Sequence, residues 1–108
     1  MAHNTPDFRT VTLTAANTNY QLSALLEALD ADIPVKCAQI GLQFDSGAGA
    51  DACLVGNSDL SATVFGRRLL ATQAFDMGPV ESNLLRTDQI WLRSNGAAHT
   101  VHVFLLTR

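Results

Sequence analysis

Apolar and polar residues alternate along several short segments of the chain, and this period of two is typical of β-strands with one buried face. The clearest of these segments runs from Val35 to Asp45. Its large apolar residues fall on one face and are Ala38, Ile40, Leu42 and Phe44. Cysteine, glutamine and glycine occupy the positions between them. We therefore expect a strand with one core face and one face that contacts solvent or another surface.

Further segments have the character of strands, because they are short, rich in β-branched residues and bounded by turn residues. They cover Phe8–Thr14, Ala52–Val55, Gln89–Arg93 and Thr100–Arg108. The last of them is apolar on both faces, with Val101, Val103 and Leu105 on one side and His102, Phe104 and Leu106 on the other. Turn signals recur roughly every 8–12 residues, which is typical of an antiparallel sandwich or barrel.

One segment has the period of a helix. Its leucines stand at i, i+3, i+4 and i+7 and are Leu22, Leu25, Leu26 and Leu29. Asn19 precedes the segment as a plausible N-cap, and Pro34 follows it. So short a helix must lie against a sheet or across the mouth of a sandwich. The sequence thus predicts an all-β fold, an antiparallel and jelly-roll-like β-sandwich, with one short helix between the first two strands.

The length of 108 residues corresponds to a single domain. We expect residues 8–108 to form the sandwich and residues 1–7 to form an extended arm, because the arm is polar and contains a proline. Charged residues make up 16% of the chain, which is below the usual quarter. A weakly charged exterior suits a protein that packs against neighbouring chains, and it equally suits a plain small domain.

The charge balance bears on the partners of the chain. The net charge is −3, and the only basic doublet is Arg67-Arg68, so a nucleic-acid partner is not expected. No apolar run approaches the roughly 20 residues of a membrane span, and the first residues do not resemble a secretory signal. We therefore expect no membrane partner and synthesis in the cytoplasm. Cys37 and Cys53 are then expected to be free, buried thiols, although a disulfide between them stays open.

Catalytic and metal-binding patterns are weak. His99 and His102 lie three apart on one strand and point to opposite faces, so we interpret them, like His3, as surface or edge histidines. Asp45 and Asp51 flank a glycine-containing loop that lacks the alternating acids of a calcium loop, and a flexible hairpin is the simpler interpretation. No nucleophile motif occurs. The sequence therefore predicts no cofactor, no metal site and no enzymatic activity.

The candidate functional residues are those whose placement suggests an interface. Trp91 shares the polar face of its strand with Gln89 and Arg93, so it is either covered by a loop or in contact with a partner. Phe104 and Leu106 lie either beneath a loop or helix or at a subunit interface. The full set of interface candidates is Gln89, Trp91, Arg93, Arg67, Arg68, Phe104, Leu106, Met1, Ala2, His3, Asn4, Thr5, Pro6 and Asp7.

Much of the chain, from about Val11 onward, resembles small virion proteins of tailed bacteriophages. The segments that carry this resemblance are Leu54–Ser61, Gly66–Leu70, Asp88–Ser94, Gly96–Ala98 and Thr100–Val103, together with Gln21–Leu26 and the strand from Val35. The chain departs from the pattern at Arg93, where a glycine is common, and in having Trp91 beside it.

The resemblance implies a jelly-roll subunit of the virion with no catalytic residues. The first hypothesis is a capsid cement (decoration) protein, made in the host cytoplasm, that binds the major capsid protein and its own copies as a homotrimer. The polar arm would reach a neighbouring chain. The alternative is a carbohydrate- or receptor-binding jelly roll of a tail or fibre, in which Trp91 would stack on a sugar. A jelly-roll metalloenzyme is a third hypothesis.

Overall fold

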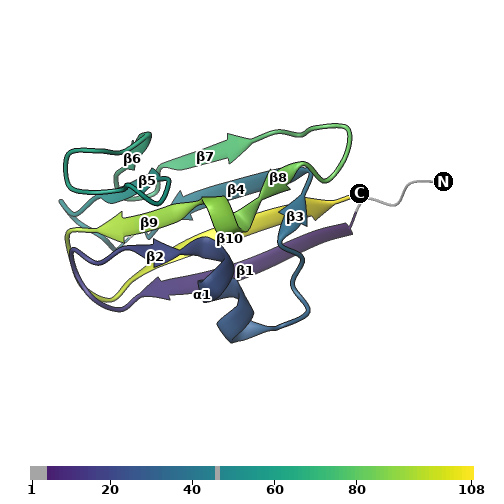
Figure 1. Cartoon of the computed structure of the whole chain (residues 1–108). Helices are drawn as coiled ribbons and strands as arrows, with labels where there is room; N and C mark the ends of the chain where they lie inside the picture. The colour runs from purple at the N-terminus through teal and green to yellow at the C-terminus, as the bar shows by residue number, and fades with distance from the viewer. Residues whose placement is uncertain (1–4, 46) are drawn as a thin grey trace.

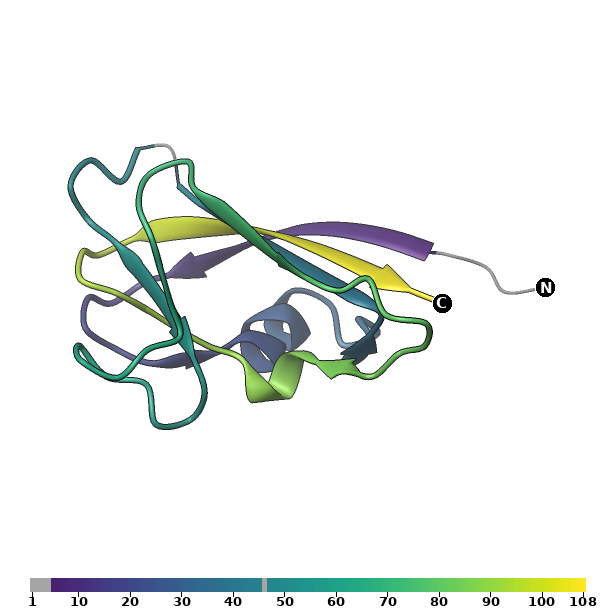
Figure 2. The same cartoon turned by 90° about the horizontal axis from the view of Figure 1, so that it is seen from above.

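The structure is a computed structural model that describes residues 5–45 and 47–108. It is an all-β antiparallel sandwich, in which two four-stranded sheets face each other (Figures 1 and 2). Sheet A contains, in spatial order, β1 (Thr5–Leu13), β10 (His99–Thr107), β4 (Gln39–Phe44) and β7 (Ala74–Met77). Sheet B contains β2 (Tyr20–Gln21), β9 (Trp91–Ser94), β5 (Cys53–Gly56) and β6 (Arg67–Leu69).

Smaller elements close one end of the sandwich. A two-stranded sheet pairs β3 (Lys36–Cys37) with β8 (Leu85–Arg86). The helix α1 (Leu22–Leu29) and the 3-10 turn η1 (Thr87–Gln89) lie at the same end, on the side of sheet A that faces the core (Figure 2). Within the described residues, no helix is long and apolar enough to cross a membrane.

The order of the strands is that of a jelly roll. Along the chain, β1, β4, β7 and β10 enter sheet A, and β2, β5, β6 and β9 enter sheet B. The chain thus crosses repeatedly between the sheets, and its first and last strands, β1 and β10, pair with each other. Two four-stranded antiparallel sheets wound in this way form two Greek keys. The predicted all-β sandwich is confirmed, and its short helix follows the second strand, β2, instead of the first.

The core fills the space between the two sheets. Its residues come from alternate positions of the strands, as the period of two predicts. Sheet A contributes Val11, Leu13, Ile40, Leu42, Phe44, Val101, Val103 and Leu105, and sheet B contributes Cys53, Val55, Leu69 and Leu92. Leu22 and Leu26 of α1 are buried against them and close one end. The helix is stable because it packs there, since an isolated helix of this length is not.

The start of α1 differs from the prediction. Gln21, not Asn19, occupies the N-cap, and it makes no side-chain capping bond. The backbone N–H of Leu22 instead donates to the carbonyl oxygen of Ile90 at 2.9 Å, which continues the pairing of β2 with β9 into the first turn. Asn19 serves a different purpose, because its side-chain Nδ2 donates to the carbonyl oxygen of Leu60 at 2.7 Å.

The segment from Val35 to Asp45 forms two strands instead of one. Lys36 and Cys37 pair with β8, whereas the strand that starts at Gln39 pairs with β10 and β7. Ala38 stands at the change of partner, and its N–H donates to the carbonyl oxygen of Leu106. Alternation of apolar residues does not indicate which strand is the partner, so the sequence pattern predicted one continuous strand.

The predicted arm is corrected at Thr5–Asp7. These residues belong to β1, and Thr5 pairs with Thr107. They are strand because β10 continues to Thr107 and offers them backbone partners. The remaining arm residues, Met1, Ala2, His3 and Asn4, lie outside the described residues.

Candidate binding sites on the two outer sheet faces

An aromatic pair lies on the outer face of sheet A. Phe8 of β1 and Phe104 of β10 are register partners, and their ring centroids are 5.2 Å apart. The side chain of Phe8 is 73% exposed, while Phe104 is half-buried. Neither α1 nor η1 covers this face, because both lie on the opposite side of the sheet (Figure 2). Phe104 therefore packs against the exposed ring of Phe8 and not beneath the helix.

The surface of sheet A has a depression beside this aromatic pair. Gly41 stands opposite Phe104 on β4, and a Cβ atom there would lie 3.4 Å from the Cβ atom of Phe104. A shallow hollow of about 170 Å³ opens at this point, between Phe104, Asp76 and His102. The outer face of sheet A thus presents an aromatic ridge next to a depression, which gives a partner both an apolar surface and a shape to fit.

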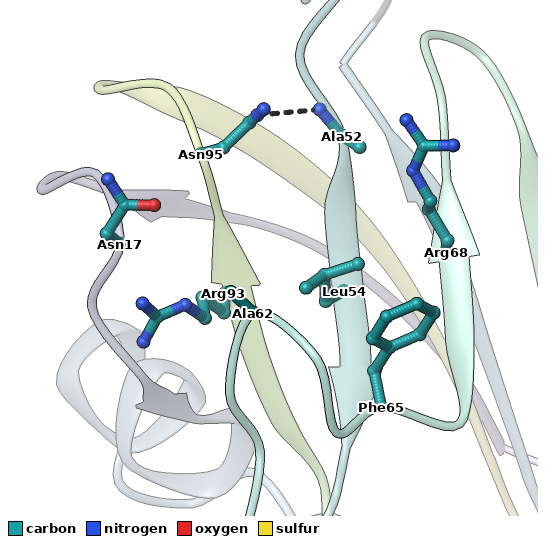
Figure 3. A pocket seen from close by; sticks show the side chains of 8 residues that line it. All are labelled: Asn17, Ala52, Leu54, Ala62, Phe65, Arg68, Arg93 and Asn95. Atoms are coloured by element: carbon teal, nitrogen blue, oxygen red, sulfur yellow. Dashed lines mark hydrogen bonds between the residues drawn. The ribbon is translucent and has the colours of Figure 1, made fainter.

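A deeper cavity of about 390 Å³ lies on the outer face of sheet B (Figure 3). Leu54 of β5 forms its floor and stands between two arginines, because its register partners are Arg68 on β6 and Arg93 on β9. The rest of the lining consists of Asn17, Ala52, Ala62, Phe65 and Asn95.

The loop of residues 57–66 forms one wall of this cavity. Two hydrogen bonds hold this loop: at its end, Gly66 N–H donates to the carbonyl oxygen of Val55 on β5 at 2.8 Å, and further inside, the carbonyl oxygen of Leu60 accepts the bond from Asn19, which precedes β2. Leu60 itself is buried and anchors the loop. The loop therefore folds back over the outer face of sheet B and brings Phe65 beside Leu54.

Trp91 lies on the same outer face but does not line the cavity. It is half-buried, and its register partner on β5 is Gly56. The loop reaches the sheet at this glycine, where a Cβ atom would lie 3.2 Å from Leu60 and 3.6 Å from the backbone of Phe65. Trp91 is thus on a face that the loop partly covers, and the sugar-stacking hypothesis built on it stays a prediction.

The structure separates the other interface candidates. Arg68 and Arg93 both line one cavity, whereas the guanidinium of Arg67 lies over the ring of Phe75, 5.4 Å from its centroid. Gln89 is exposed at the end of η1, and Leu106 is half-buried on sheet A.

Sequence reasoning missed Phe8, Phe65, Asn17 and Asn95. The phase of Phe8 was informative, because it is opposite to that of the buried Val11 and Leu13. For the other three residues no pattern was available, since loops bring them to the cavity.

A third cluster involves His99 at the end of the sandwich, near Asp45 and Asp51. Its Nε2 atom lies 2.7 Å from Asp51 Oδ2, and its Nδ1 atom lies 3.5 Å from Asp45 Oδ2. The ring also meets Phe44 edge-on. His99 is therefore not the surface or edge histidine of the prediction, whereas His102 is exposed.

The two carboxylates change the titration of this cluster. The hydrogen bond with Asp51 has the largest effect and raises the pKa of His99, burial opposes this rise, and the hydrogen bond with Asp45 adds to it. The pKa of Asp45 is lowered, chiefly because its carboxylate accepts a hydrogen bond from the backbone N–H of Gly47. A Cβ atom at Gly96 would overlap Asp51, so this glycine leaves the space in which Asp51 reaches His99.

The cluster does not define a metal centre. Among residues 5–45 and 47–108, no group of three or more histidine, cysteine or acidic side chains is arranged to hold a metal ion. Asp45 and Asp51 approach opposite nitrogen atoms of one imidazole ring. The chemistry that this arrangement supports is the binding of a proton by His99.

Comparisons of the chain with protein-family models, with curated proteins and with solved structures found no match.

Proposed function

We propose that the chain is a structural virion subunit, a capsid cement protein of a tailed phage that binds the major capsid protein and its own copies as a homotrimer. The observation that carries the contact part of this proposal is the exposure of Phe8 beside Phe104 on the open face of sheet A. Exposed aromatic side chains that lie together are typical of surfaces that bind other proteins. The virion setting comes from the resemblance of the segments between Leu54 and Val103.

The edge strand β1 supports the same surface. It is nine residues long and stands at the edge of sheet A, so one side of its backbone has no strand partner among the described residues. Long open edges are sites at which another chain can add a strand, and soluble monomers usually protect them. Phe8 lies on this strand, so backbone pairing and aromatic burial would occur in one contact.

The test is binding to the capsid. Purified chain is mixed with expanded empty heads of the phage that encodes it, and bound protein is measured by co-sedimentation. Phe8→Thr keeps a strand-forming residue but removes the ring, and we expect it to weaken binding by about tenfold or more. Leu84→Thr is the matched control, because Leu84 is also 73% exposed but lies outside the sheet.

Equal binding of both variants would contradict the assignment of sheet A as the contact surface. Absence of binding by the unmodified chain would contradict the cement function itself. The self-association is tested separately by sedimentation equilibrium, for which we expect a species of three times the monomer mass of 11.6 kDa.

A further inference from the structure

The cavity on sheet B carries two positive charges that have no negative partner among the described residues. Arg68 makes no ion pair in the part of the chain that the structure describes, and Arg93 donates to a neutral group, the Oδ1 atom of Asn19, at 3.2 Å. No acidic side chain lines the cavity. In a chain with a net charge of −3, two uncompensated guanidinium groups at one concave site favour an anionic ligand.

The two arginines are held apart by the sheet. They flank Leu54 on the strands at either side of it, so their backbones are about 10 Å apart at the ordinary spacing of strands. In Figure 3 the side chains of Arg68 and Arg93 lie on either side of Leu54 and point in different directions. This arrangement favours an extended ligand with acidic groups at intervals over a single small anion.

The rest of the lining suits a hydroxylated ring. The Oδ1 atom of Asn95 accepts a hydrogen bond from the N–H of Ala52 at 2.9 Å, which fixes the side chain and leaves its amide N–H groups to donate. Asn17 is held in a left-handed conformation at φ 54°, with its N–H bonded to the carbonyl oxygen of Ser94. The side-chain amides of Asn95 and Asn17 at the cavity can donate to and accept from hydroxyl groups.

The apolar part of the site has the shape of a ring-binding surface. Phe65 is 43% exposed and stands beside Leu54, so an aromatic wall meets an aliphatic floor. The volume of about 390 Å³ is within the range of small-ligand sites, which begins near 300 Å³. From these features we propose that the cavity binds an acidic oligosaccharide, with one sugar ring over Leu54 and against Phe65, and with carboxylates of different sugar residues at Arg68 and Arg93.

This site is independent of the capsid contact, because it lies on the other sheet and on the opposite face of the sandwich. The cavity would give the chain a second binding activity, directed at acidic polysaccharide, while sheet A faces other protein chains. The ligand chemistry rests on the arginines, the amides and Phe65, and not on Trp91.

The test uses calorimetric titration of the full chain at low ionic strength with three probes, each of four sugar or amino-acid units. Tetragalacturonate is the acidic saccharide, maltotetraose is a neutral saccharide, and acetylated, amidated tetraglutamate is an acidic peptide. We expect tetragalacturonate to bind at least about tenfold more tightly than either of the others, since only it offers both rings and carboxylates. Equal binding of maltotetraose would overturn the carboxylate assignment, and equal binding of tetraglutamate would make an acidic peptide the ligand.

Variants locate the binding. Arg68→Gln and Arg93→Gln are each expected to weaken tetragalacturonate binding about tenfold. Arg67→Gln is the matched control, because it removes the same charge from the adjacent residue, which lies over Phe75 and outside the cavity. Phe65→Leu keeps the site apolar and tests the ring. An equal loss in Arg67→Gln and Arg68→Gln would show unspecific charge attraction, and absence of any binding would also overturn the proposal. Neither result bears on capsid binding by sheet A.

Discussion

Phe8 and Phe104 are register partners on β1 and β10, and their rings meet at an interplanar angle of 40° on a face that neither α1 nor η1 covers. The outer ring, that of Phe8, remains 73% exposed, so the pair contributes little burial to the isolated chain. An aromatic pair of this kind contributes about 0.5–1.5 kcal/mol. The stability of the fold does not explain the exposed ring, whereas burial in the proposed assembly would.

This relationship predicts that Phe8→Thr separates stability from binding. We expect the free energy of unfolding to fall by no more than about 1.5 kcal/mol, because only the contact between the rings is lost. Urea denaturation followed by circular dichroism measures it, with Leu84→Thr as the control at an equally exposed leucine. A loss above about 3 kcal/mol would mean that Phe8 is a core residue in practice.

Leu92 gives the opposite prediction, because its side chain is fully buried between the sheets. Leu92→Ala removes apolar contacts and leaves a cavity, so we expect the free energy of unfolding to fall by about 2–5 kcal/mol. Leu84→Ala at the surface should change it by less than about 0.5 kcal/mol. The two variants are compared in the same denaturation experiment. Similar effects would contradict the predicted division between core and surface.

Cys37 and Cys53 are free and buried, and burial raises their pKa values to about 11 and about 12. The reactive species is the thiolate, so both thiols should be almost inert towards an aromatic disulfide reagent at pH 8 in the native chain. In denaturant, both should react at the rate of an ordinary cysteine. Rapid labelling of either thiol in the native state would show that the core around it opens, and absence of labelling in denaturant would reveal a disulfide.

His99 predicts a stability that falls with rising pH. Its pKa is raised in the folded state, so its protonated form is the one that Asp51 and Asp45 stabilise. This contribution is complete below the ordinary histidine pKa of about 6.5 and is lost as the pH rises through the higher folded value. We expect the free energy of unfolding of the unmodified chain to decrease across this window. His99→Gln should remove this dependence.

His102→Gln is the control for this experiment, because His102 is exposed and its recorded partner is the uncharged hydroxyl group of Thr10. It should leave the pH dependence of the unmodified chain in place. A slope that persists in His99→Gln would assign the effect to another group. At the acid end, the lowered pKa of Asp45 predicts a separate loss of stability as the pH falls through its folded value.

The fold was accessible from the sequence because burial repeats along each strand. The alternation from Val101 to Leu105 and from Ile40 to Phe44 predicts that every second side chain in these segments lies in the core, as observed. The spacing of the leucines in α1 likewise predicted its buried face, where Leu22 and Leu26 are buried, but it was wrong for Leu29, which is 53% exposed. These patterns are local, so the period of each segment can be read from its own residues.

The sites were less accessible because they depend on strand register and on loops. Arg68 and Arg93 are 25 positions apart in numbering and become neighbours of Leu54 only through the pairing of three strands. His99 at the start of β10 in sheet A meets Asp51, which precedes β5 of sheet B, across 48 positions of sequence. A single sequence does not encode such pairings in its hydrophobic period, so it indicated the residue types of these sites but not their partners.

A density map of the native phage particle tests the cement-protein proposal most directly. We predict jelly-roll density on the outside of the head, arranged as trimers at three-fold positions, with Phe8 and Phe104 buried against a neighbouring chain. A head whose density is fully accounted for without this fold, or one that contains the fold with Phe8 facing solvent, would contradict the proposal.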